Sequence, residues 1–396
     1  MFQTKAYIAK STNLFLEEGL IPRRNVGPDD ILIEVMFVGL NKHDVVNLTK
    51  ENNIFPMVPG LEVTGVVQNV GTNVLYLTPG DVVGVSRVID SCKICNMCLN
   101  KQFQYCEKGP TLIYNSRNEF NSMELGFPTF GGISQVIVVD KNHVIKIPGN
   151  INLARMTPLL YSGMLAYSPI KDYYLKPGDN FGVIGLNEIG NIAIKFGVAI
   201  GAQVTVFDFS EENKSYVLYE LKADKFIKID DIDKSIEGSF DFILDTRFED
   251  NGINKIDSFI DILKYDGSLS IINTTQNLIS SSVQNKNIGN KTIKKSPISS
   301  TKEIQEMIFF CSKYKIDCDI DLISANQIND CLKKLENSSI RNNTVVDVTT
   351  IDNENKDINI KEQIYKTIND YISQYQDENT KFTIEDHVEL ESDSED

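Results

Sequence analysis

The sequence contains no tryptophan and only three histidines, His43, His143 and His387. A metal or acid–base site that needs histidine therefore has few candidates. Long apolar runs are also absent, and no apolar segment opens the chain, so we expect neither a membrane span nor a signal peptide, and a cytoplasmic location. Positive charge is scarce, with 39 Lys and Arg against 55 Asp and Glu. The net charge of -16 argues against binding to nucleic acid.

The 396 residues are enough for two domains, and a hydrophobic content of 41% is enough for sizeable cores. The second half is rich in Asn, Ile, Lys and Asp. That bias is typical of AT-rich genomes, such as those of amoebae, apicomplexans and large DNA viruses. In the viral case, packaging of the protein into the virus particle is a further hypothesis.

Four of the seven cysteines stand close together in one stretch: Cys92, Cys95, Cys98 and Cys106. Four thiolates at this spacing can close a tetrahedral Zn²⁺ site without an open position, which shapes a loop and performs no chemistry. Free thiols or two disulfides are the alternatives. The other cysteines, Cys311, Cys318 and Cys331, are scattered, as expected for buried thiols in a reducing compartment. We therefore predict one structural zinc ion per chain.

The spacing pattern of the apolar residues changes near residue 150. Residues 1–150 read as a β-rich domain from which the four-cysteine lobe, 92–106, protrudes. Residues 151–290 alternate short apolar strands with helical stretches, which predicts an α/β domain with a doubly wound parallel sheet. Residues 291–349 return to the first domain, although 276–300 are hard to place. His143 follows Asn142 before a short strand, and we expect it at the surface or in a turn.

Residues 350–396 differ in composition from the rest of the chain. Apolar residues recur at helical spacing from Ile360 to Tyr375, which predicts one amphipathic helix. An acidic stretch follows, and it reads as a disordered tail that could bind a protein partner.

Several motifs resemble the zinc-type medium-chain alcohol dehydrogenases, and most closely the cinnamyl-alcohol-dehydrogenase branch. They are Pro79-Gly-Asp-Val-Val-Gly84, the cysteine lobe, Gly131-Gly-Ile-Ser-Gln135 and Pro158-Leu-Leu-Tyr-Ser-Gly163. The resemblance covers roughly residues 1–349. It implies a GroES-like β domain with a structural-zinc lobe, a Rossmann-type domain for NAD or NADP, and a homodimer.

The resemblance also shows where the reactive zinc of that family would be held, by a Cys, a His and a second Cys. The matching positions here are Asn41, Leu61 and Tyr161. Glu62, which follows the family's His, is retained. None of the three usual ligands is present, so we predict that the catalytic zinc is lost.

Two readings of these substitutions stay open. His43, Glu62 and Tyr161 offer nitrogen and oxygen ligands, although tyrosinate is a poor ligand at neutral pH and Lys42 would oppose a divalent ion. Alternatively, Gly39-Leu-Asn-Lys-His-Asp44 and Pro59-Gly-Leu-Glu62 are similar to motifs of the zinc-independent quinone reductases. Such a site would need no metal, and His43 or Tyr161 would supply a proton.

The nucleotide fingerprint is incomplete. Its first and third glycines are Gly185 and Gly190, and Asn187 takes the place of the second, where its side chain occupies space for the phosphate. Glu188 adds a negative charge that repels a phosphate. Asp208 ends the next strand and suits the ribose of NAD better than the extra phosphate of NADP.

Three functions follow from these observations. The leading one is an oxidoreductase-like protein that has lost metal-assisted alcohol oxidation and works as a pseudoenzyme or interaction protein. The main alternative is a metal-independent, NAD(H)-linked reductase of carbonyl or activated alkene substrates. The third is an ordinary zinc-dependent alcohol dehydrogenase, which requires ligands that the sequence does not show.

Overall fold

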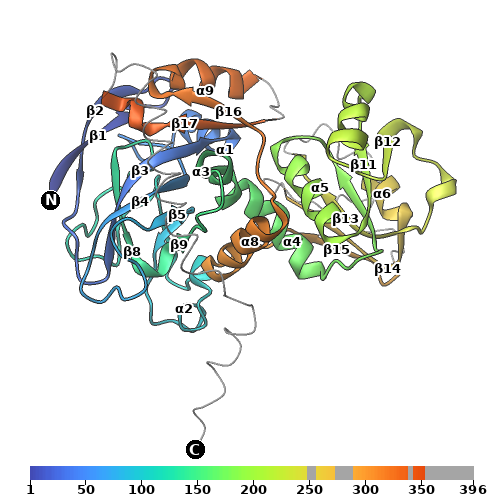
Figure 1. Ribbon diagram of the computed structural model, residues 1–396, viewed down its shortest axis with the longest axis horizontal. Helices are drawn as coiled ribbons and strands as arrows, with labels where there is room; N and C mark the ends of the chain where they lie inside the picture. The colour runs from blue at the N-terminus through green and yellow to red at the C-terminus, as the bar shows by residue number, and fades with distance from the viewer. Residues whose placement is uncertain (248–255, 273–288, 338–341, 353–396) are drawn as a thin grey trace, which may run out of the picture.

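The structure is a computed structural model that describes residues 1–247, 256–272, 289–337 and 342–352. It consists of a β domain and an α/β domain, with helices α4 (Ser162–Tyr173) and α8 (Thr301–Tyr314) between them (Figure 1). Among the helices of these residues, none is long and apolar enough to cross a membrane. The predicted helix at 360–375 and the acidic tail lie outside the described residues.

The β domain is built on a seven-stranded sheet whose central strand, β3 (Asp30–Leu40), pairs with β4, β8 and β17. Most side chains of β3 are apolar and buried on both faces of the sheet, which explains its nearly continuous hydrophobic sequence. A hairpin of β1 (Phe2–Ile8) and β2 (Glu17–Arg23) forms a separate two-stranded sheet. The other strands of the large sheet are β4 (Glu62–Val70), β5 (Val82–Val85), β8 (Val136–Asp140), β9 (Val144–Lys146), β16 (Ile320–Ser324) and β17 (Asn343–Asp347).

The α/β domain holds six parallel strands in the order β12-β11-β10-β13-β14-β15. This is the doubly wound order of dinucleotide-binding sheets, with a crevice where the direction of winding reverses, beyond the carboxyl ends of β10 and β13. Helix α5 (Glu188–Ile200) follows β10, and α6 (Ile256–Ile262) precedes β14. The strands are β10 (Asn180–Ile184), β11 (Gln203–Asp208), β12 (Lys225–Lys228), β13 (Phe240–Asp245), β14 (Leu263–Ile271) and β15 (Thr292–Lys295).

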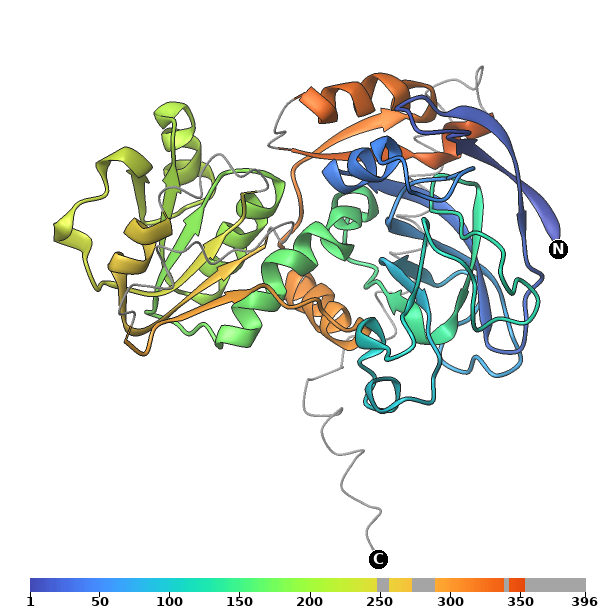
Figure 2. The same cartoon turned by 180° about the vertical axis from the view of Figure 1, so that it is seen from behind.

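After β15 the chain returns to the first domain (Figure 2). Gln305 on α8 exchanges two side-chain hydrogen bonds of 2.8 Å with the backbone of Lys146 on β9. Strand β17 then inserts beside β3, and β16 pairs with β17, covered by α9 (Ile328–Asn337). The predicted architecture, a β domain beside an α/β domain with a doubly wound parallel sheet, is thus confirmed. The limits predicted at 150, 290 and 349 stay predictions, and the parallel sheet extends to β15, just past 290.

Candidate functional site

The four-cysteine lobe is assembled by short elements that follow β6 (Val88–Asp90). Cys95 is the N-cap of α2 (Asn96–Leu99), which carries Cys98, and Cys106 ends the 3₁₀ turn η1 (Phe103–Tyr105). The four Sγ atoms lie within 4.8 Å of one another, and those of Cys92 and Cys98 are 3.8 Å apart. Tetrahedral zinc with Zn–S bonds of about 2.3 Å requires S–S separations of about 3.8 Å. The lobe therefore fits structural zinc, and the cysteines form no disulfide.

Backbone amides support the thiolate form of Cys92 and Cys95, whereas burial raises the pKa of the other two lobe cysteines. The amide of Cys95 donates to Cys92 Sγ at 3.4 Å, and the amide of Glu107 donates to Cys95 Sγ at 3.5 Å. Hydrogen bonding from the Ile94 amide, with that of Cys95, lowers the pKa of Cys92 to about 6. The Glu107 amide lowers the pKa of Cys95 in the same way. Since metal ligation requires the thiolate, these amides favour a bound cation.

A buried charge cluster fastens the lobe to the β domain. Lys93 Nζ lies 3.1 Å from Asp90 Oδ1 and 2.6 Å from Asp140 Oδ2. His143 is near both carboxylates, and the three acceptor groups are close enough together to hold a metal ion. The Lys93 ammonium bridges the two carboxylates, so this cluster is an ion-pair network. His143 was expected at the surface or in a turn; it ends the 3₁₀ turn η2 (Lys141–His143), but it is only 1% exposed, so a surface position is wrong.

The first catalytic-zinc position, Asn41, serves as a helix cap. It is the N-cap of α1 (Lys42–Thr49), and its Oδ1 accepts a hydrogen bond of 2.9 Å from the His43 amide. Asp44 accepts from the Asn41 amide in return, as well as from Gly60 N and the Tyr114 hydroxyl. Burial raises the pKa of Asp44 to about 6. These hydrogen bonds hold the start of α1 in place.

The second position, Leu61, lies in the hydrophobic core and is 1% exposed. The next residue, Glu62, is equally buried, and its Oε1 accepts two hydrogen bonds of 3.0 Å, from the amide and the hydroxyl of Ser162. Burial raises the pKa of Glu62 well above its usual value. The retained acid thus links β4 to the start of α4.

The third position, Tyr161, faces His43, with 5.7 Å between the ring centroids. Burial raises the pKa of Tyr161 to about 12, so the phenol stays protonated at neutral pH. Burial, together with the nearby charge of Arg87, lowers the pKa of His43 to about 4. Arg87 was missed by the sequence reading, although a single arginine within an apolar stretch between Val85 and Val88 was a signal that could have been followed.

These segments meet as the resemblance implies, and the three ligand positions are occupied by Asn41, Leu61 and Tyr161. Within the part of the chain that the structure describes, the two groups of His, Cys, Asp and Glu that could hold a metal are the lobe and the Lys93 cluster. His43 faces both Tyr114 and Tyr161, and the charge of Arg87 acts on all three side chains.

At the nucleotide fingerprint, Asn187 turns its side chain back onto its own helix. It is the N-cap of α5, and its Oδ1 accepts from the amides of Ile189 at 3.1 Å and Gly190 at 2.9 Å. Its Nδ2 donates to the Thr246 carbonyl at 2.7 Å. Those amides are the groups that a helix N-terminus offers to a pyrophosphate. The asparagine side chain therefore competes with the phosphate for the same donors.

The two retained glycines have structural roles that need no nucleotide. Gly185 has a φ of +89°, which L-residues rarely adopt. A Cβ on Gly190 would lie 2.1 Å from the Gly185 carbonyl oxygen, so the close approach of α5 to β10 requires glycine. Glu188 opens the same helix, and burial raises its pKa to about 7.

Asp208 stands where a ribose-binding acid belongs, at the carboxyl end of β11. Strand β11 is adjacent to β10, and the Gly185 amide donates to the Phe207 carbonyl at 2.9 Å. The Asp208 Oδ1 accepts from the next amide, that of Phe209, at 2.7 Å. The position of Asp208 suits binding to a ribose. Its hydrogen bond with the Phe209 amide is one that any acidic residue at a turn could make.

Known proteins share this architecture over most of the chain. Residues 27–149 match the alcohol dehydrogenase GroES-like domain. The "Probable formaldehyde dehydrogenase AdhA" of Bacillus subtilis is 34% identical over 353 residues, which span 88% of this chain and 99% of that protein. This chain belongs to the zinc-type medium-chain alcohol dehydrogenase family.

Solved structures of family members superpose on most of this chain. A cinnamyl alcohol dehydrogenase of Sorghum bicolor matches with a TM-score of 0.81 and 29% identity, covering 88% of this chain and 98% of the other. The cinnamyl alcohol dehydrogenase of Helicobacter pylori, solved with NADP(H), matches with a TM-score of 0.79, 31% identity and the same coverage. The chain is therefore an alcohol-dehydrogenase-like member of the oxidoreductases with a cysteine lobe for zinc.

Proposed function

We propose that this family member keeps the fold and the lobe zinc but has lost zinc-assisted alcohol oxidation, and that it works as a binding or interaction protein. The observation that carries the proposal is which residues occupy the three ligand positions and what those residues do. Asn41 caps a helix, Leu61 fills the core, and Tyr161 is a buried neutral phenol. A catalytic zinc site needs three protein ligands and one open position.

The incomplete nucleotide fingerprint supports the same proposal. Asn187 holds the two amides of α5 that would otherwise face a pyrophosphate, and Glu188 adds an acid beside them. We therefore expect dinucleotide binding to be weaker than in relatives with a complete fingerprint. Any residual binding should favour NAD over NADP, because Asp208 would repel a 2′-phosphate.

A metal-independent reductase is the second candidate, and one specific geometry favours it. Tyr161 and His43 lie side by side, and the raised pKa of Tyr161 keeps a proton on the phenol. A bound NAD(H) would supply the hydride for a carbonyl carbon. Tyr161 would then give its proton to the carbonyl oxygen and recover one from solvent through His43.

Metal analysis and nucleotide titration separate these functions. We expect about one zinc per purified chain, no oxidation of aliphatic or aromatic alcohols, and weak or no binding of NADH in calorimetry. Two zinc ions per chain together with alcohol oxidation would overturn the proposal. Binding of NADH, with turnover of aldehydes or quinones in the presence of a chelator that leaves the lobe intact, would favour the reductase.

Three further expectations belong with this proposal. The edge strand β15 pairs with β14 along one side, and an edge strand can pair with a second copy, so we expect a homodimer, which light scattering would test. Thiolate ligands favour a reducing intracellular compartment. The acidic residues after 350 are proposed to bind a protein partner, which cross-linking with and without the tail would test.

A further inference from the structure

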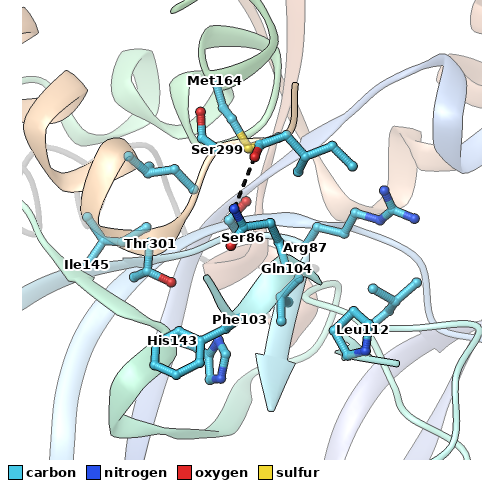
Figure 3. A pocket seen from close by; sticks show the side chains of 14 residues that line it. Ser86, Arg87, Phe103, Gln104, Leu112, His143, Ile145, Met164, Ser299 and Thr301 are labelled. Atoms are coloured by element: carbon cyan, nitrogen blue, oxygen red, sulfur yellow. Dashed lines mark hydrogen bonds between the residues drawn. The ribbon is translucent and has the colours of Figure 1, made fainter. Parts of the chain in front are cut away.

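A cavity of ≈ 120 Å³ lies between the segment 86–88, the cysteine lobe and the return segment 298–304 (Figure 3). A single water needs only about 10–15 Å³ of such space, so the cavity has room for a molecule of several non-hydrogen atoms. None of the three former zinc positions lines it. Arg87 lines it and also influences His43 and Tyr161, so the cavity adjoins the former zinc site.

Buried polar atoms without a partner gather on this cavity. Within the described residues, no hydrogen-bond partner is found for Arg87 Nε, Gln104 Oε1, Ser299 Oγ and both ring nitrogens of His143. All four residues line the cavity. Nearly all buried polar groups in folded proteins are hydrogen-bonded, so such a concentration indicates a place for a polar ligand.

The charge of the lining selects the kind of ligand. No Asp or Glu lines the cavity, and Arg87 is its one formally charged residue, since burial lowers the pKa of His143 to about 4 and leaves the imidazole neutral. The Arg87 guanidinium has no ion-pair partner among the described residues. An unpaired guanidinium suits a carboxylate, which it can bind through two parallel hydrogen bonds.

The rest of the lining is largely apolar: Val88, Phe103, Leu112, Ile145, Met164 and Ile304. In Figure 3, Phe103 and His143 lie together on one side, while Arg87 extends in another direction. The lining thus combines one cationic group with an apolar surface. A phosphate would make no favourable contact with the apolar surface, and a neutral hydrocarbon would not pair with the guanidinium.

We propose that this cavity binds a small organic carboxylate, with the carboxylate on Arg87 and an apolar body against Phe103 and Leu112. The inference rests on the proposed function. A divalent cation beside His43 and Tyr161 would repel the Arg87 guanidinium, and the proposed function has no such cation. It adds the chemical class of the ligand to that function.

Benzoate and its neutral isostere benzamide provide the test, titrated calorimetrically into the full chain with its lobe zinc. We expect benzoate to bind at least about tenfold more tightly than benzamide, since hydrogen bonds to charged groups are the stronger ones. Arg87→Gln should abolish this preference, and Arg87→Lys should keep part of it. The matched control Arg117→Gln changes an exposed arginine whose side chain donates to Gly126 O, and it should keep all of the preference.

Equal binding of the two probes, no benzoate binding at millimolar concentration, or an unchanged preference in a folded Arg87→Gln protein would each overturn the inference. The comparison of the two probes in the unmodified protein decides the matter even where a variant does not fold. Zinc content and alcohol oxidation are measured on the same preparation. A second zinc with turnover refutes the proposed function, whereas absent benzoate selectivity with one zinc and no turnover refutes this inference alone.

Discussion

Glu62 and Ser162 join the two domains through a buried carboxyl group whose Oε1 accepts hydrogen bonds of 3.0 Å from the amide and the hydroxyl of Ser162. Glu62 begins β4 of the first domain, and Ser162 begins α4, which packs with α5 of the second. Burial raises the pKa of this carboxyl well above 4.5, so the folded protein holds a proton that the unfolded chain releases. Stability therefore falls as pH rises from about 4.5 through the folded-state pKa.

Glu62→Gln should remove this pH dependence. We expect the unfolding free energy of the variant, relative to the unmodified protein, to rise by more than about 1 kcal/mol between pH 4.5 and pH 8. Urea denaturation across that range measures it. Glu34→Gln changes an exposed glutamate on β3 and should leave the pH profile unchanged. Parallel profiles for Glu62→Gln and the unmodified protein would contradict the assignment.

The lobe zinc should depend on each of its four thiolates. Cys98→Ser replaces a buried ligand on α2, and we expect the zinc content to fall from about one per chain to near zero, with a loss of about 2 kcal/mol or more in stability. Elemental analysis and thermal unfolding measure these effects. Cys331→Ser alters a buried thiol beside Thr344, outside the lobe, and should retain the zinc. Full zinc content in Cys98→Ser would show that the lobe is not the site.

Asn187→Gly should release the amides of Ile189 and Gly190 for a phosphate. The loss of the cap costs only a few tenths of a kcal/mol, since glycine is a tolerated N-cap. We expect NADH to bind at least about tenfold more tightly, because a fingerprint glycine lets the backbone approach the pyrophosphate. Asn152→Gly removes the N-cap of α3 (Leu153–Met156) by the same chemical change, and should leave NADH affinity unaltered. Unchanged affinity in Asn187→Gly would mean that Asn187 does not block the site.

Restoring the family's ligands should restore the second metal. In the triple variant Asn41→Cys, Leu61→His and Tyr161→Cys, we expect zinc content to rise from about one to about two per chain. A polar imidazole at the core position of Leu61 should cost about 1–3 kcal/mol without the metal. The double variant that keeps Leu61 lacks the nitrogen ligand and should stay near one zinc. A triple variant that folds and still holds one zinc would show that the backbone no longer supports the site.

Elements with a strong local pattern were predictable from the sequence. The alternation of short apolar strands and helices predicted after residue 150 is found in strands β10 to β14 with helices α5 and α6. The cysteine lobe was predictable because four ligands lie within one short loop. Strand β15 was not, since its residues Thr292–Lys295 carry no apolar alternation and take their place only by pairing with β14.

The polar residues of the site were harder to predict for a related reason. The burial of His143 and the partial burial of Arg87 depend on segments distant in the chain, such as the lobe and the return segment, so no local sequence pattern predicts them. Asn187 was expected to fill the space of the phosphate. Its side chain also takes the hydrogen-bond donors that a phosphate would use. This hydrogen bonding depends on the side-chain rotamer in the folded helix cap, which the sequence does not show.

The insertion of β17 beside β3 has a consequence for the order in which the protein folds as it is synthesised. Strand β3 is the centre of the first sheet, yet one of its neighbours leaves the ribosome only after the whole α/β domain. Domains generally fold as units during synthesis. The α/β domain can therefore complete its sheet before the N-terminal domain does. Until β17 is synthesised, one edge of β3 remains unpaired. A chain truncated before Asn343 would keep that edge, and would be prone to pair it with another molecule.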